Sequence, residues 1–230
     1  MENNIEKIRH SLSHVLASAV LEIYPKTKLG IGPAIENGFY YDFALPAEAL
    51  REGGNDKFLQ KIEDRMKKLI LQNQKFVKKN TTKLAARKLF KDQPYKLELI
   101  KELPGKNVSI YTNGSFTDLC KGPHINSTKE IDVNTFKLTK IAGAYWKGSE
   151  KNKMLTRIYG IAFDTEKKLL DYLKIMEEAE KRDHRKLGKD LKIFTFSDFV
   201  GPGLPLWLPN GTVIIEELER LAKEMETNAG

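Results

Sequence analysis

The segment from Asn4 to Tyr24 constrains the fold most, because its apolar residues recur at the spacing of one helix face. Successive apolar positions lie three or four residues apart, and Pro25 ends the pattern. The residues of this apolar stripe are Ile5, Ile8, Leu12, Leu16, Ala19 and Ile23. A helix with one apolar face has to bury that face, so we expect it to pack against a sheet.

Two further helices and several short strands follow. A second helix is predicted from Asp56 to about Gln74, and Thr81 or Thr82 is placed to cap a short helix that continues through Phe90. Short runs with turn residues at their ends predict strands at residues 29–31, 38–43, 95–100, 108–112, 136–141 and 154–162. Asn113-Gly114 predicts a tight turn directly after one of these strands.

The last third of the chain changes character. Asp164 or Thr165 is placed to cap a long helix to about Leu187, which ends in a basic stretch. Gly201-Pro202-Gly203 and later prolines predict an irregular stretch before a helix from about Thr212 to Met225. We therefore expect an α+β fold: a mainly antiparallel sheet with packed helices, then a long linker helix and a truncated C-terminal segment.

Composition restricts the class of protein. Hydrophobic residues make up 40% of the 230 residues, which is enough to bury a core. No run approaches the roughly 20 apolar residues of a membrane span, and the polar Met1-Glu2-Asn3-Asn4 does not resemble a signal peptide. With Cys120 as its single cysteine, the chain is expected to be cytoplasmic. The net charge of +8 suits a nucleic-acid partner, or equally a basic surface that binds nothing.

Two of the four histidines, His10 and His14, lie four residues apart on the first helix. They are therefore separated by roughly 40° around the helix axis and project from one face. That face lies roughly 140° to 180° from the apolar stripe. A lone helical histidine is more often a hydrogen-bonded core residue, but a pair that points away from the stripe favours a functional site.

The single cysteine and a third histidine form a second pair, Cys120 and His124. Gly122-Pro123 predicts a turn between them, so this pair is expected on a loop after a strand. Together the two pairs offer four side chains that can bind zinc, move protons or donate hydrogen bonds. The metalloprotease pattern is excluded, because Ser11-Leu12-Ser13 places no glutamate beside the first histidine.

The two pairs in this order resemble the editing domain shared by threonyl- and alanyl-tRNA synthetases and by free-standing deacylases. Longer runs are similar to the threonyl members: Ile31-Gly32-Pro33, Gly38 to Asp42, Asp118 to His124 and Ala142 to Trp146. Arg182 to Gly188 resembles the end of that enzyme's linker helix. The segment from Pro205 to Gly211 resembles the entry to its class II catalytic domain.

The resemblance implies a division into an editing (aminoacyl-tRNA deacylase) domain at 1–163, a linker helix at 164–190 and the truncated start of an aminoacylation domain at 191–230. It implies hydrolysis of Ser-tRNA(Thr) to serine and tRNA, with the aminoacylated 3′ end of tRNA(Thr) as partner and no membrane. ATP and the catalytic zinc would belong to a part that follows, so this chain is expected to be too short to aminoacylate. The full-length enzyme is expected to be a homodimer.

The resemblance also implies roles for individual residues. His10 is the leading candidate for direct catalysis, with His14, Cys120 and His124 in the same cleft. Lys96 matches a lysine that places the water or the developing charge, although without the resemblance it reads as an exposed strand residue. The substrate-binding candidates are Tyr41, which lines the pocket, and Asp118, which holds the substrate ammonium or hydroxyl group.

Two alternatives remain beside this hypothesis. No metal is expected to be required for editing, but zinc held by His10, His14, Cys120 and His124 would instead make the chain a zinc-dependent deacylase. The other alternative is a tRNA-binding fragment without catalytic activity.

Overall fold

The computed structural model describes residues 2–49, 54–201 and 203–230, so Pro202 of the predicted irregular stretch lies outside the described residues. The chain divides into two compact units, Met1–Leu169 and Leu170–Gly230. Helices and antiparallel sheets both occur, which confirms the predicted α+β class. Within the described ranges, no helix combines the length and apolar character needed to cross a membrane.

The larger core of the first unit lies beneath a five-stranded antiparallel sheet. Its strand order is β1-β3-β8-β7, and β2 pairs with β3. The bounds are β1 Lys28–Leu29, β2 Ala34–Ile35, β3 Gly38–Ala44, β7 Phe136–Tyr145 and β8 Met154–Ala162. Two helices pack against this sheet, α1 (Glu2–Ile23) and α2 (Gly54–Ile70). Leu12, Leu16 and Ala19 of the apolar stripe of α1 are buried there, as the periodicity predicted. Ile8 and Ile23 are partly buried against this core, whereas Ile5 is half-buried and lies outside it.

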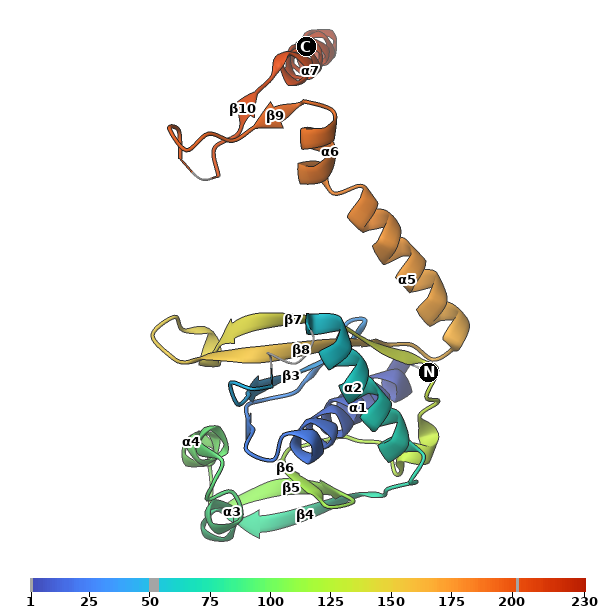
Figure 1. Cartoon of the computed structure of the whole chain (residues 1–230), viewed down its shortest axis with the longest axis vertical. Helices are drawn as coiled ribbons and strands as arrows, with labels where there is room; N and C mark the ends of the chain where they lie inside the picture. The colour runs from blue at the N-terminus through green and yellow to red at the C-terminus, as the bar shows by residue number, and fades with distance from the viewer. Residues whose placement is uncertain (1, 50–53, 202) are drawn as a thin grey trace. The chain divides into compact units, whose positions relative to one another are not determined.

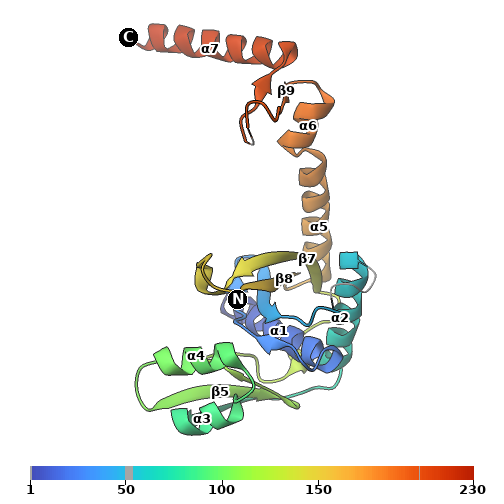
Figure 2. The same ribbon diagram turned by 60° about the vertical axis from the view of Figure 1, so that its left-hand side comes forward.

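A second, three-stranded antiparallel sheet carries part of the site. Its order is β4-β5-β6, with β4 at Phe76–Thr82, β5 at Asn107–Asn113 and β6 at Phe116–Leu119. Two helices, α3 (Lys83–Leu89) and α4 (Pro94–Glu102), form a small core with one face of this sheet. Helix α1 lies between the two sheets in both views (Figure 1, Figure 2). The first helix is therefore positioned to present residues to the second sheet.

Local signals predicted one strand of the second sheet, β5, and the turn after it, but not β6. Thr82 caps α3 by accepting a hydrogen bond from the Ala85 amide at 3.2 Å, and Gly114 turns the chain between β5 and β6 with φ of +57°. The sequence did not predict β4, because most of its side chains are polar and exposed. Such a strand lacks the alternation of apolar and polar residues that marks a half-buried strand.

The prediction of a strand at 95–100 was wrong, because these residues belong to helix α4. Pro94 occupies the first turn of this helix, where its fixed φ suits a helix and its missing amide hydrogen costs nothing. Lys96 and Ile100 are the buried residues of α4, and their four-residue spacing is that of one helix face. The run is too short for its period to distinguish helix from strand.

One long helix was predicted from Asp164 or Thr165 to about Leu187, but the structure has two helices there. Helix α5 (Glu166–Lys181) begins at the end of the first unit, and α6 (His184–Asp190) follows. Asp183 starts α6 by accepting a hydrogen bond from the Arg185 amide at 2.8 Å. A short hairpin pairs β9 (Phe194–Thr195) with β10 (Leu206–Trp207), and α7 (Pro209–Ala229) follows it. Helix α7 begins three residues before the predicted start.

Candidate functional site

The two predicted pairs of residues meet in the first unit. His10 and His14 lie on α1, whereas Cys120 and His124 lie on the loop that follows β6. One nitrogen or sulfur atom from each of these four side chains lies within 4.8 Å of those of the other three. The geometry therefore brings together groups that are more than 100 residues apart in the sequence, as the sequence analysis expected.

The shape of the Cys120–His124 loop depends on Gly122. Its φ is +76°, and a Cβ atom at this position would overlap the hydroxyl group of Tyr111. The Gly122 amide donates a hydrogen bond to Cys120 Sγ at 3.3 Å, and the Cys120 amide donates to Ser109 O at 3.2 Å. The loop therefore holds the thiol against the sheet while the chain turns back toward His124.

The hydrogen bonds of the site fix where its protons lie. Pro123 O can only accept, so His10 Nδ1 donates to it at 3.1 Å, and neutral His10 keeps a free electron pair on Nε2. Cys120 S–H then donates to His10 Nε2 at 3.3 Å. Since the thiol has one proton, His124 Nε2 must donate to Sγ, also at 3.3 Å. His124 Nδ1 consequently accepts from the Ser11 hydroxyl at 3.0 Å.

Burial keeps these groups uncharged. It lowers the pKa of His10 and His124, and it lowers the pKa of His14 well below the ordinary range because that ring is almost fully buried. Burial also raises the pKa of the Cys120 thiol to about 11. Near neutral pH the site therefore holds three neutral imidazoles and a protonated thiol.

A buried ion pair lies beside the cluster. Lys96 and Asp118 are 1% and 2% exposed, and Lys96 Nζ lies 2.5 Å from Asp118 Oδ1. Tyr41 donates its hydroxyl hydrogen to Asp118 Oδ2 at 2.6 Å and accepts one from Lys96 at 3.0 Å. His14 Nε2 lies 3.9 Å from the same carboxylate oxygen. The reading of Lys96 as an exposed strand residue is therefore wrong.

A cleft of about 760 Å³ opens beside α1 and reaches the cluster at His10. Pro33, Ile35 and Pro123 also line it, and so do charged residues from the first turns of α1. Lys96, Asp118 and Tyr41 do not line this cleft and are buried. Of the predicted site residues, His10 is therefore the one that belongs to both the cluster and the wall of this cleft.

The four-residue cluster also has the composition of a zinc site. Imidazole nitrogen and cysteine sulfur are the ligands that zinc prefers in tetrahedral sites, and here four such atoms lie within 4.8 Å of one another. His14 Nδ1 is buried and has no hydrogen-bond partner among the described residues. The residues present therefore fit zinc, and they would hold it through His10, His14, Cys120 and His124.

Two contributors to the site were not predicted from the sequence. Ser11 bridges the two halves of the site, because its hydroxyl contacts His124 Nδ1 and accepts from the Ile125 amide at 3.2 Å. The ring of Tyr111 lies 4.5 Å from that of His124. A serine between two helical histidines and a tyrosine in a strand carry no local signal of these contacts, which depend on the tertiary structure.

Comparison with known proteins gives a consistent result. The model of the family described as "Threonyl and Alanyl tRNA synthetase second additional domain" matches residues 108–159. A threonine--tRNA ligase of Thermotoga petrophila is 51% identical over 227 residues, covering 98% of this chain and 34% of the relative. One from Dehalococcoides mccartyi is 49% identical over 228 residues, covering 99% and 38%. One from Staphylococcus epidermidis is 48% identical over 230 residues, covering 100% and 35%.

Proposed function

We propose that this chain removes a wrongly attached amino acid from tRNA by hydrolysis. The proposal starts from its similarity to the second additional domain of threonyl and alanyl tRNA synthetases and to threonine--tRNA ligases. The observation that carries the proposal is the position of His10, whose ring joins a buried cluster of proton-transfer groups to an open cleft. The chain spans about a third of the length of the curated relatives it matches, so the activities of those whole enzymes enter here only as proposals.

The substrate we propose is Ser-tRNA(Thr). Threonine and serine differ by one methyl group, which gives a binding pocket only about 1–3 kcal/mol of discrimination. A threonine-charging enzyme therefore needs a second site that hydrolyses the serine ester. The products are serine and tRNA(Thr), and the partner is the aminoacylated 3′ end of that tRNA.

The chemistry we propose requires a general base and a cationic group held in a fixed position. An aminoacyl ester is already activated, so the site has mainly to position a water molecule or ribose hydroxyl and stabilise the oxyanion. His10 Nε2 has the free electron pair that accepts the proton, and its Nδ1 hydrogen bond to Pro123 O orients the ring. The substrate hydroxyl or water takes the place of the Cys120 thiol at that nitrogen.

Lys96 supports this chemistry from behind the cluster. The role we propose for its ammonium group, which is paired with Asp118, is to help place the water or the developing charge. Asp118 contacts Lys96 through Oδ1 and accepts a hydrogen bond from Tyr41 through Oδ2. We therefore assign Asp118 and Tyr41 the role of holding Lys96 in place. Direct contact of Asp118 and Tyr41 with the substrate, which the resemblance implied, stays a prediction.

We also keep the predicted domain division as a proposal. In it residues 1–163 form the editing domain, 164–190 connect it, and 191–230 begin an aminoacylation domain. The cytoplasm as the place of the reaction, and a homodimer as the state of a full-length enzyme, belong to the same proposal. It is supported by similarity to threonine--tRNA ligases over 98–100% of the chain.

A second candidate is a zinc-dependent deacylase, which the three imidazoles and one thiol favour. Bound zinc would lower the pKa of a coordinated water and so supply hydroxide near neutral pH. In that case the four residues would act as ligands, and Ser11 would accept a hydrogen bond from His124 Nδ1 instead of donating one. Stoichiometric zinc in the purified protein would support this candidate.

The test compares release of serine and threonine from charged threonine tRNA, with and without a chelator. We expect faster release of serine, insensitivity to the chelator, and a loss of about 10²- to 10⁴-fold in His10→Ala. His184→Ala changes an exposed histidine of α6 and is the matched control. Equal release of both amino acids would contradict the proposed selectivity, and loss with chelator would favour zinc. Binding of tRNA without release of serine would indicate a non-catalytic module.

A further inference from the structure

The positive charge of the chain is concentrated in one stretch. Between Asp64 and Asp92 there is no acidic residue, although ten of the 39 basic residues lie there. The rest of the chain therefore has 29 basic residues against 31 acidic ones. Since the whole chain has a net charge of +8, its excess of positive charge belongs to this stretch.

Seven of these cations form what we call the basic segment, residues 75–91. It consists of strand β4, helix α3 and their immediate flanks. Its members are Lys75, Lys78, Lys79, Lys83, Arg87, Lys88 and Lys91. All are exposed except Lys83, which is half-buried and donates to Leu103 O. Upstream, by contrast, Arg65 and Lys67 each form an ion pair, with Glu22 and Glu63 respectively.

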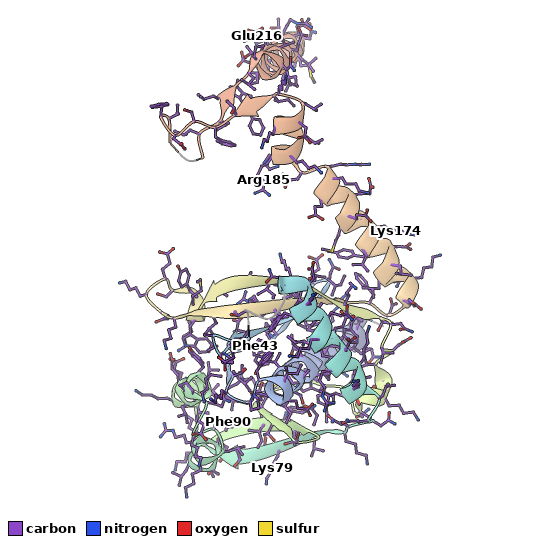
Figure 3. The ribbon with its side chains drawn as sticks, in the orientation of Figure 1. Phe43, Lys79, Phe90, Lys174, Arg185 and Glu216 are labelled. Atoms are coloured by element: carbon purple, nitrogen blue, oxygen red, sulfur yellow. The ribbon has the colours of Figure 1, made fainter. Side chains whose placement is uncertain are left out.

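The six exposed cations of the segment are available to a partner. Within residues 2–49, 54–201 and 203–230, none of them forms an ion pair with a carboxylate. Strand β4 is also an edge strand, paired with β5 alone, and Figure 3 shows Lys79 on it at the outer side of the three-stranded sheet. A row of lysines on an edge strand also protects against strand pairing with another chain, but that need does not extend to helix α3.

The basic segment adjoins the candidate site. Lys78 Nζ donates a hydrogen bond to Lys121 O at 3.2 Å and lies 5.9 Å from the centre of the Tyr111 ring. Lys121 belongs to the loop between Cys120 and His124, and Tyr111 contacts the ring of His124. A polyanion that lies along the segment would therefore end next to the catalytic cluster.

We propose that the basic segment binds the phosphate backbone of the tRNA acceptor stem and so guides the charged 3′ end to the cleft. This inference rests on the proposed function. At about 3.3 Å per residue, the eight steps from Lys75 to Lys83 extend over roughly 26 Å, a length that faces several consecutive phosphates. Contacts of this kind set affinity and orientation without reading the sequence of the stem.

The test measures binding of uncharged threonine tRNA at several salt concentrations. The variant is the triple substitution Lys79→Gln, Arg87→Gln, Lys88→Gln, whose side chains are exposed and make no hydrogen bond or ion pair among the described residues. We expect affinity to fall about tenfold at low salt. The slope of log affinity against log salt should also become shallower by about 2 to 3, because each phosphate that is no longer neutralised reduces it by roughly 0.9.

A charge-matched control separates a local surface from net charge. Lys137→Gln, Lys151→Gln, Lys153→Gln removes three exposed lysines, one in β7 and two in the connection from β7 to β8, and should leave the slope unchanged. Equal loss in both triple variants, or no loss in the first, would overturn the inference. Because the tRNA is uncharged, this result does not depend on hydrolysis. A short serine ester that lacks the acceptor stem should be hydrolysed equally by both triple variants. This measurement tests the proposed function separately from tRNA binding.

Discussion

Lys96 and Asp118 form a buried ion pair, so each charged side chain depends on the other for compensation of its charge. Both side chains are almost completely buried, and their charged atoms lie 2.5 Å apart. A buried ion pair adds little stability over apolar residues, but the loss of one partner leaves an uncompensated charge. Its presence beside the candidate site therefore favours a role in positioning the lysine over a role in stability.

We predict that Asp118→Asn is strongly destabilising. The substitution keeps the size of the side chain but leaves the Lys96 ammonium group without an anion, so the free energy of unfolding should fall by about 3–5 kcal/mol. Urea denaturation provides the measurement. Tyr41→Phe is the control, because it removes the hydrogen bonds of the Tyr41 hydroxyl to Asp118 and Lys96 but leaves the ion pair, and should cost only about 1–3 kcal/mol. Combining Asp118→Asn with Lys96→Met should restore much of the loss, and strict additivity would contradict this account.

At the scale of elements, helix α4 is held in place by the connection between β7 and β8. Trp146 Nε1 donates a hydrogen bond to Glu98 Oε2 at 2.9 Å, and Lys147 forms an ion pair with the other carboxylate oxygen at 2.5 Å. The rings of Tyr95 and Trp146 lie 4.9 Å apart. Since α4 also carries Lys96, this contact orients the lysine from outside the site.

We predict that Glu98→Ala loosens α4 without unfolding the chain. Alanine maintains the helix propensity, so the effect should come from removal of the hydrogen bond to Trp146 and the ion pair with Lys147. Amide hydrogen exchange in residues 94–102 should become roughly fivefold faster, while exchange in α1 stays unchanged. Lys101→Ala, an exposed substitution on the same helix, is the control. An unchanged exchange rate in α4 would show that these interactions do not hold it.

At the scale of the whole molecule, one buried and two half-buried histidines couple stability to pH. Burial lowers the pKa of His10, His14 and His124 in the folded state, whereas in the unfolded chain the pKa of each is about 6.5. As the pH falls below 6.5, the unfolded chain binds protons that the folded chain does not. The stability that these groups provide is therefore complete above pH 6.5 and decreases as the pH falls toward their folded-state pKa values.

We predict that the free energy of unfolding falls by up to about 4 kcal/mol between pH 7.5 and pH 5.5. Each histidine contributes about 1.4 kcal/mol per pH unit once the pH lies below 6.5. Denaturant titrations at several pH values measure this slope. His184→Gln, on an exposed position of α6, should leave the slope unchanged, whereas His124→Gln should make it shallower. Constant stability over this range would show that the imidazoles are not held neutral by burial.

The sequence by itself determined the features that depend on near neighbours. The period of the apolar residues predicted α1 and its histidine face, Asn113-Gly114 predicted the β5–β6 turn, and Gly122-Pro123 predicted the loop at Cys120. Each of these depends on local backbone preferences or on a repeat that can be read within a short window. The motifs also indicated a resemblance to threonyl-tRNA synthetases, and threonine--tRNA ligases are similar to this chain over 98–100% of its length.

Only the tertiary structure decided how these residues meet in space. It brought Cys120 and His124 to His10 and His14 across more than 100 residues, and it placed Lys96 on a buried helix face where the sequence had predicted a strand. The role of Ser11 and the polar strand β4 were also missing from the sequence analysis. The physical reason is that hydrophobic periodicity indicates only which face of a helix or strand is apolar. Which other element packs against that face depends on contacts between segments far apart in the chain.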